Sequence, residues 1–222
     1  MKNDYTHIVV ILDRTGSMET IRDDTIGGFN AFLNTQKAEP GMASLTLVQF
    51  DSQDPYEIVH KFKPLAEVPE LTRETFVPRA ATPLLDAIGR GINDLEKSLA
   101  DMPEDEKPAR VVMVLITDGQ ENASREFRKD QIEKMIKEKQ EKSDWQFVFL
   151  SADLAAIGDA LASGVSAASA IAFDRDRRGV TAAWESLSTS IAGYRSGRKE
   201  DVSFTEEDRT RQAAEKKRKA QN

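Results

Sequence analysis

The stretch IVVILDRTGSM, residues 8–18, determines the fold that the sequence predicts. Its first five residues form a continuous, largely β-branched apolar run, which is typical of a strand buried on both faces of a parallel sheet. The polar residues from Asp13 to Ser17 then indicate a turn and the start of a helix, and Gly16 makes a sharp turn inexpensive. We therefore expect a central strand whose carboxyl end carries Asp13.

The rest of the chain alternates predicted strands with predicted helices. Further strands are expected at residues 45–50, 57–62, 111–116, 145–150 and 168–173. Apolar residues at three- and four-residue spacing predict helices over residues 18–32, 85–99, 124–141, 154–161 and 180–194. The second and third strands are joined by the short segment DSQDP, which favours an antiparallel hairpin. The predicted class is α/β and Rossmann-like, with a mostly parallel six-stranded sheet, one antiparallel edge strand and helices on both faces.

Length and periodicity predict one domain with a tail. The 222 residues suffice for one sizeable α/β domain, which we place at residues 1–200. From Phe204 onward the apolar periodicity disappears, so residues 201–222 are expected to form a charged C-terminal tail, either a frayed helix or a flexible segment. Its basic run KKRK could bind an acidic partner or nucleic acid, although such runs are usually solvated.

Composition excludes several classes of function. The formal net charge of −7 disfavours nucleic acid as a partner, because the overall field repels phosphate backbones. The absence of cysteine excludes disulfides and thiolate metal sites, and it fits a reducing compartment. No apolar stretch approaches the roughly 20 residues of a membrane helix, and the first strand lacks the length of a signal peptide. We expect a soluble, cytoplasmic protein without a membrane partner.

Oxygen-bearing side chains gather in three segments, DRTGSM, ATPLLDA and ITDGQEN. They offer the carboxylates of Asp13 and Asp118 and the hydroxyls of Thr15, Ser17 and Thr82. Because the carboxyl ends of parallel strands meet at one edge of a sheet, these groups are expected to lie together. Such an all-oxygen set suits a hard divalent cation. Each segment also has a plainer interpretation, since Thr15, Ser17 and Thr82 could cap helices and Asp118 could be a turn residue.

The ordered combination of these segments resembles the metal-ion-dependent adhesion site (MIDAS) of von Willebrand factor A domains. In that family a strand is followed by Asp-x-Ser-x-Ser, then comes a threonine, and a second strand is followed by Asp-Gly. The resemblance covers about residues 5–197 and is strongest toward bacterial and phage members similar to tellurite-resistance-associated, TerY-like proteins. Thr15 departs from the usual serine; it keeps the hydroxyl but adds a methyl group and a stiffer χ1.

The resemblance implies a Rossmann-like von Willebrand A fold and a metal site formed by Asp13, Thr15, Ser17, Thr82 and Asp118. The ion would be Mg²⁺, with Mn²⁺ or Ca²⁺ as alternatives, and a partner protein would supply an Asp or Glu carboxylate. The protein would then be a non-enzymatic protein–protein interaction module, an adaptor in a bacterial or phage system.

Four further residues, Arg14, Asp51, Glu121 and Asn122, are expected on the rim of this site, where they could select partners. For each of them an ordinary role as a solvated loop residue is equally open. Asp86, four residues after Thr82, could brace the loop or face solvent.

Two other functions remain open on sequence grounds. A phosphotransferase-like hydrolase on a similar sheet needs a second Asp two residues after its nucleophilic Asp, and that position is Thr15 here. A structural subunit would use the oxygen cluster for capping alone, and would not depend on metal.

Overall fold

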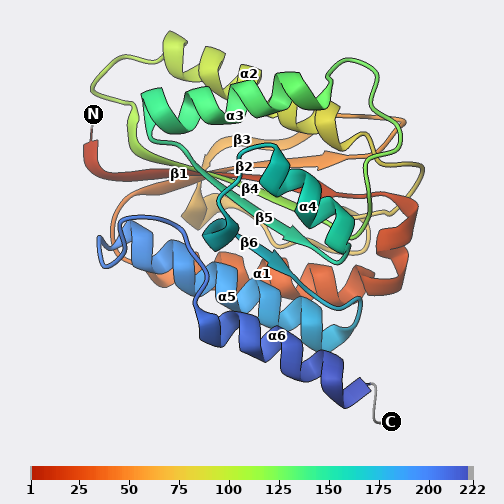
Figure 1. Cartoon of the computed structure of the whole chain (residues 1–222). Helices are drawn as coiled ribbons and strands as arrows, with labels where there is room; N and C mark the ends of the chain where they lie inside the picture. Colours follow the sequence, from red (N-terminus) through yellow and green to blue (C-terminus); the bar gives the residue numbers. More distant parts are fainter. Residues whose placement is uncertain (1, 220–222) are drawn as a thin grey trace.

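The computed structural model describes residues 2–219 of the chain and the side chains of residues 4–212 (Figure 1). Its centre is a six-stranded sheet with the order β3-β2-β1-β4-β5-β6. All neighbouring strands are parallel except β2 and β3, which are antiparallel, so β3 is the predicted antiparallel edge. The strands are β1 (Lys2–Asp13), β2 (Ala43–Phe50), β3 (Glu57–Pro64), β4 (Pro108–Thr117), β5 (Gln146–Ser151) and β6 (Ala170–Ala172).

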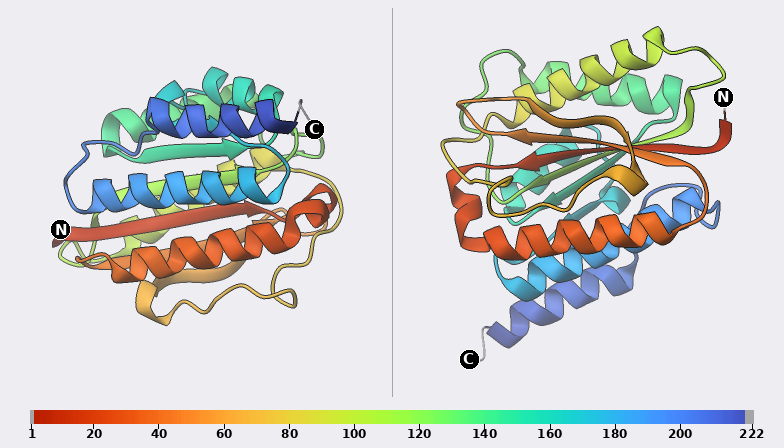
Figure 2. Two further views of the ribbon diagram at one scale, coloured as in Figure 1. Left: turned by 90° about the horizontal axis from the view of Figure 1, so that it is seen from below. Right: turned by 180° about the vertical axis from the view of Figure 1, so that it is seen from behind.

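Helices cover both faces of this sheet, which confirms the predicted α/β class. One face carries α2 (Leu84–Asp101), α3 (Lys129–Ser143) and α4 (Leu154–Ala162); the other carries α1 (Arg22–Ala38) and α5 (Arg177–Arg195). Outside α5 lies α6 (Glu206–Lys219), and Figure 2 shows α1, α5 and α6 side by side. Short 3-10 helices occur at η1 (Gly16–Ile21), η2 (Leu65–Glu67) and η3 (Ala167–Ser169).

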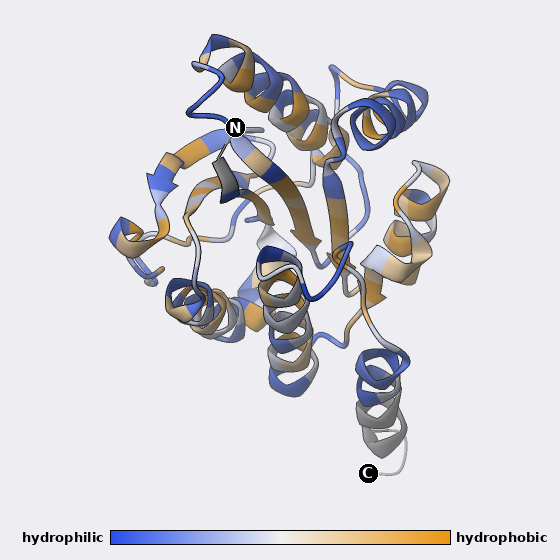
Figure 3. Ribbon diagram, turned by 90° about the vertical axis from the view of Figure 1, so that its left-hand side faces the viewer, coloured by the Kyte–Doolittle hydropathy of each residue, from blue (hydrophilic) through white to orange (hydrophobic). Residues whose placement is uncertain are grey.

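The central strand is buried on both sides, as its apolar run predicts. Ile8, Val10 and Leu12 pack into the core under α1 and α5, whereas Val9 and Ile11 pack under α2 and α3. Successive side chains of a strand point to opposite faces, so one continuous apolar run serves two cores. Figure 3 shows the same pattern, with hydrophobic strands at the centre and helices that are hydrophilic on their outer sides.

The contact between α1 and α5 depends on a glycine. A Cβ atom on Gly28 would lie 2.1 Å from Cδ1 of Trp184, so only glycine allows the two helices to approach this closely. The Trp184 ring also packs against Phe29 and Phe32, with ring centroids 5.9 and 5.8 Å away. This aromatic cluster fixes α5, and the loop that precedes it, against the sheet.

Several predicted boundaries differ from the structure; α1, for example, runs to Ala38 rather than to residue 32. The helix expected from residue 124 begins at Lys129 instead, because the Asp86 carboxylate accepts hydrogen bonds from the amides of Arg125, Glu126 and Phe127. Asp86 is buried and does not face solvent, and the loop that it braces is the one before α3 rather than the one that carries Thr82.

The segment from residue 201, expected to be a frayed helix or a flexible tail, contains the helix α6 and is packed on the domain as far as residue 212. Val202 and Phe204 are buried in the core, and Gln212 is buried where α6 meets α5. The guanidinium of Arg209 donates to the backbone carbonyls of Ala167, Ala168 and Ala170. The side chains of the basic run at residues 216–219 lie outside the described residues. Among the helices described, none has the length and apolar character that crossing a bilayer requires.

Candidate metal centre

The two predicted aspartates lie side by side at the carboxyl edge of the sheet. Asp13 is the last residue of β1 and Asp118 directly follows β4, and these strands are parallel neighbours with Leu12 opposite Ile116. Both side chains are fully buried. The parallel topology therefore brings together two carboxylates that are more than a hundred residues apart in sequence.

Asp13 organises the loop that follows it. Its Oδ1 accepts a 2.7 Å hydrogen bond from the amide of Thr15, and its Oδ2 accepts a 2.5 Å hydrogen bond from the Thr117 hydroxyl. The Gly16 amide donates to the Ala80 carbonyl at 3.1 Å, which ties this loop to the segment before Thr82. The sharp turn after β1 is thus held from both sides.

The three predicted hydroxyls converge beside Asp118. The Thr15 and Ser17 hydroxyl oxygens are 3.3 Å apart, and Ser17 donates a 2.6 Å hydrogen bond to Asp118 Oδ1. A Cβ atom built on Gly119 would lie 3.8 Å from Ser17 Oγ and 3.9 Å from Thr82 Oγ1. The Ser17 and Thr82 hydroxyls therefore flank the same glycine. Thr15 and Thr82 are buried, whereas Ser17 is exposed, so the cluster opens to solvent on the Ser17 side.

Helix capping does not account for these hydroxyls. Thr15 stands at the N-cap of η1 without a side-chain capping bond, and α2 begins at Leu84 with Pro83 at its N-cap position. The position of Thr82 is set instead through its backbone, because its amide donates to Asn122 Oδ1 at 2.9 Å and its carbonyl accepts from the Asn122 amide at 3.1 Å. Thr82 Oγ1 stays available for another ligand.

The electrostatics of the cluster favour a cation. Burial raises the pKa of Asp13 to about 6; hydrogen bonds from Thr117 and Thr15 oppose this shift, and the charge of Asp118 adds to it. Asp118 Oδ2 is buried and has no hydrogen-bond partner. An ionised, buried oxygen without a donor is costly, and a divalent ion is a common way to satisfy it.

The donor set therefore fits a hard divalent ion. It consists of two carboxylates and three hydroxyls, and the described part of the chain holds no group of three or more acidic or histidine side chains that would form another kind of metal site. Oxygen ligands of this kind suit hard divalent cations.

The structure corrects the expected rim at two positions. Arg14 and Asp51 are buried, 6% and 0% exposed, and they pair with each other: Arg14 Nε donates to Asp51 Oδ2 at 2.9 Å. Arg79 Nε donates to the same oxygen at 2.9 Å. Because neighbouring residues on extended backbone point in opposite directions, Arg14 turns away from the Asp13 side chain and toward β2. This pair is a buried ion pair rather than an exposed rim.

Glu121 and Asn122, the other two residues expected on the rim, differ from each other in their surroundings. Glu121 is a loop brace, since its carboxylate accepts hydrogen bonds from the amides of Leu85, Ala123 and Ser124 at 3.0, 2.8 and 2.7 Å. Asn122 is exposed beside Thr82, which is compatible with a rim position.

One residue of the site was missed from the sequence. Arg175 follows β6, and its Nε lies 3.5 Å from Asp118 Oδ2 while its Nη2 donates to the Asp118 carbonyl. The signal that could have found it is the rule that located the aspartates, because Arg175 also follows a strand that ends at this edge.

No protein-family model and no curated protein matches the sequence, whereas solved structures share its fold. The pilus adhesin SpaC from Lactobacillus rhamnosus GG matches over 86% of this chain with 15% identity and a TM-score of 0.63. Proximal thread matrix protein 1 from the mussel byssus, with zinc in its MIDAS motif, matches over 86% with 14% identity and a TM-score of 0.58. A von Willebrand factor type A protein from Catenulispora acidiphila matches over 86% with 10% identity and a TM-score of 0.57.

This chain spans 30%, 47% and 43% of the lengths of those three proteins, so it corresponds to one part of each. At such identities the likeness concerns the fold. The strand order, the single antiparallel edge and these neighbours identify the fold of this chain as the Rossmann-like fold of von Willebrand factor A domains.

Proposed function

We propose that this protein is a metal-ion-dependent protein interaction module that binds a carboxylate of its partner through a Mg²⁺ ion. The observation that carries the proposal is the Asp118 side chain: Oδ1 accepts from the exposed Ser17, and Oδ2 is buried without a hydrogen-bond partner. These features describe an oxygen cluster that is open to solvent, in which one buried carboxylate oxygen lies near the Arg175 guanidinium but accepts no hydrogen bond.

The residues of the cluster would have different roles in metal binding, and their surroundings decide which. Ser17, Thr15 and Thr82 would offer hydroxyl oxygens, and Asp118 would supply a charged oxygen. Both oxygens of Asp13 already accept hydrogen bonds, so Asp13 would contribute charge through the hydroxyls or through water while it holds the Thr15 loop in place. When bound, the ion would act as a Lewis acid for an anionic oxygen from outside.

The charge balance favours a carboxylate ligand. Two aspartates neutralise one divalent ion formally, the Arg175 guanidinium beside Asp118 leaves one positive charge over, and Mg²⁺ retains waters that an incoming oxygen can replace. The Asp or Glu of a partner is then a suitable third anion. The methyl group of Thr15 is no obstacle, because this side chain is only 1% exposed and its hydroxyl still reaches to 3.3 Å from Ser17 Oγ.

We further propose that the module is an adaptor in a bacterial or phage system, on the basis of its TerY-like motif spellings. It is not proposed to be an enzyme. A phosphotransferase of the haloacid dehalogenase type needs an acid two residues after Asp13, and Thr15 cannot transfer a proton in that role.

Titration with Mn²⁺, followed by electron paramagnetic resonance, tests the metal site. Mn²⁺ shares the oxygen preference of Mg²⁺ and is directly visible. We expect one ion per chain in the wild type and none in Asp118→Asn. Asp23→Asn is the matched control: it removes the same charge from an exposed aspartate on α1 and should bind like the wild type. Equal binding by all three variants, or none by any, would refute the proposal.

A further inference from the structure

Arg175 places a positive charge directly against the candidate metal centre. Its Nη2 donates to the backbone carbonyl of Asp118, and its Nε lies 3.5 Å from Oδ2 of the same residue. The Asp118 side chain is 0% exposed whereas that of Arg175 is 45% exposed. One side of the guanidinium thus faces the buried aspartate, and the rest of it is accessible from outside.

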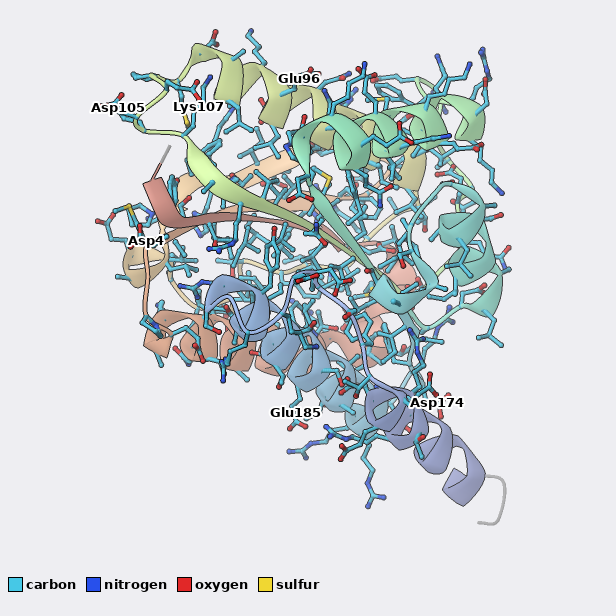
Figure 4. All side chains as sticks on the ribbon, turned by 60° about the vertical axis from the view of Figure 1, so that its left-hand side comes forward. Asp4, Glu96, Asp105, Lys107, Asp174 and Glu185 are labelled. Carbon is cyan, nitrogen blue, oxygen red and sulfur yellow. The ribbon has the colours of Figure 1, made fainter. Side chains whose placement is uncertain are left out.

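The loop that carries Arg175 lies at the same edge as the oxygen cluster. It connects β6 to α5, and Phe173 in this loop donates its amide to the Ser151 carbonyl at the end of β5. Figure 4 shows Asp174, the preceding residue, at the opposite side of the molecule from Asp4, Asp105 and Lys107, which lie at the amino edge of the sheet.

Two neighbouring loops contribute a polar pair, Gln120 and Asp153, and the charge of Arg175 acts on Asp153. The Gln120 amide donates to both carboxylate oxygens of Asp153 at 3.2 and 3.1 Å. Burial opposes ionisation of Asp153, but the Gln120 amide, the amides of Ala156 and Ala155 and the Arg175 charge together lower its pKa. Arg175 is therefore close enough to Asp153 to interact with it electrostatically, and Gln120 ties Asp153 to the loop that follows Asp118.

We propose that Arg175 is a specificity-determining residue of this centre, one that weakens the binding of the metal alone and strengthens the binding of a carboxylate to the metal-loaded protein. The proposal rests on the proposed function, because it concerns the same oxygen cluster.

The weaker binding of the metal alone follows from competition for the Asp118 carboxylate. The guanidinium neutralises Asp118 as long as the metal is absent, and a divalent cation must approach the same carboxylate against the repulsion of Arg175. An elementary charge near a divalent ion, at a partly exposed site, is enough to change the metal affinity about tenfold.

The stronger binding of a carboxylate follows from the N–H donors of Arg175 that are not used by Asp118. A guanidinium has five N–H donors in a planar fork, and Arg175 directs only part of them at Asp118. A ligand carboxylate that arrives at the metal adds negative charge beside this fork, and a charge-assisted hydrogen bond can form. The metal and the carboxylate then bind more tightly together than separately, and this coupling is reciprocal.

The test is a Mn²⁺ titration by electron paramagnetic resonance, with and without excess acetate as the carboxylate probe. Arg175→Ala should bind Mn²⁺ alone about tenfold more tightly than the wild type. Acetate should tighten Mn²⁺ binding by the wild type, and this effect should be smaller in Arg175→Ala, where only the metal holds the acetate. Arg175→Lys keeps the charge without the fork, so its affinity for Mn²⁺ alone should stay near that of the wild type.

Arg198→Ala is the matched control. It removes the same charge from an arginine that is 68% exposed and lies beyond the other end of α5, and it should behave as the wild type in both titrations. If Arg175 only supported the structure, Arg175→Ala would bind Mn²⁺ more weakly than the wild type, because Asp118 would lose that support.

The outcomes separate the two proposals. Equal or weaker Mn²⁺ binding by Arg175→Ala, or an acetate effect as large in it as in the wild type, overturns the role of Arg175 and leaves the metal centre intact. Absence of Mn²⁺ binding in the wild type and in all variants refutes the metal centre itself, and the role of Arg175 falls with it.

Discussion

The hydroxyl of Ser17 donates a 2.6 Å hydrogen bond to Asp118 Oδ1 across 101 residues of sequence. This contact joins the loop after β1 to the loop after β4, and it lies at the opening of a cluster whose other members are buried. Since Oδ2 of the same carboxylate lacks a hydrogen-bond partner, Ser17 is the side-chain hydroxyl that both holds Asp118 and could share a metal with it.

Ser17→Ala should separate these two roles. In the metal-free protein it removes one donor from a buried carboxylate, which should cost about 1–3 kcal/mol of unfolding free energy in urea. Binding of Mn²⁺ should weaken at least about tenfold, because a ligand is lost as well. Ser17→Thr, which keeps the hydroxyl, is the control. A Mn²⁺ affinity unchanged in Ser17→Ala would remove Ser17 from the site.

Asp13→Asn should abolish metal binding and yet stabilise the metal-free fold near neutral pH. The pKa of Asp13 in the folded protein is about 6, above its ordinary value of 3.8. The native state therefore binds this proton more tightly than the unfolded state. Its contribution to stability is full below pH 3.8 and is lost as the pH rises through about 6.

The neutral asparagine avoids this cost, so the variant should gain about 1–3 kcal/mol over the wild type at pH 7.5 in chelator. The gain should shrink toward pH 4. Urea unfolding at the two pH values measures both effects. Destabilisation at pH 7.5 would show that the hydrogen bonds to Thr15 and Thr117 outweigh the desolvation of the charge.

His7 should make the fold sensitive to acid. It is fully buried, stacks on Phe62 with ring centroids 3.8 Å apart, and lies within hydrogen-bond distance of Ser44 and Thr46. Burial lowers its pKa from 6.5 to about 3. The unfolded state thus binds the proton more tightly, and stability is kept above pH 6.5 and lost on acidification toward pH 3.

The expected slope from His7 is about 1.4 kcal/mol per pH unit between these values. Asp13 acts in the opposite direction between pH 3.8 and 6, so the His7 effect has to be isolated as a difference. The stability gap between the wild type and His7→Gln should shift in favour of the variant as the pH falls from 6.5 to 4.5. A gap that does not change with pH would contradict the assignment.

The two glycines at the start of α1 offer a matched pair. A Cβ on Gly28 would overlap Trp184, whereas a Cβ on Gly27 would meet nothing within 4 Å. Gly28→Ala should destabilise the fold by about 1–3 kcal/mol through overpacking, while Gly27→Ala should stabilise it by about 0.5–1 kcal/mol through helix propensity. Thermal unfolding of both variants measures the difference. Equal effects would mean that α5 shifts freely on α1.

Some features of the site were predictable because they follow from topology alone. Asp13 and Asp118 end parallel strands, so their proximity required only the strand assignment and the edge rule. The direction in which a side chain points was harder to predict from the sequence. Arg14 follows Asp13 directly, but it points toward Asp51 on the other side of the strand, and no pattern in the sequence specified that buried pair.

The packing of the C-terminal segment also escaped the sequence analysis. It depends on isolated residues, chiefly Val202, Phe204 and the carbonyl contacts of Arg209, and too few apolar positions recur there to produce a helical period. Arg175 was missed for a related reason, since β6 is only three residues long and its end was not recognised as part of the site edge.

The central claim is that a divalent ion binds among Asp13, Thr15, Ser17, Thr82 and Asp118. Anomalous diffraction from crystals grown with Mn²⁺ tests it most directly. The account predicts one anomalous peak within coordination distance of the Ser17 hydroxyl and an Asp118 oxygen, and no such peak in Asp118→Asn crystals. A wild-type map without a peak there, with the Ser17–Asp118 hydrogen bond intact, would contradict it.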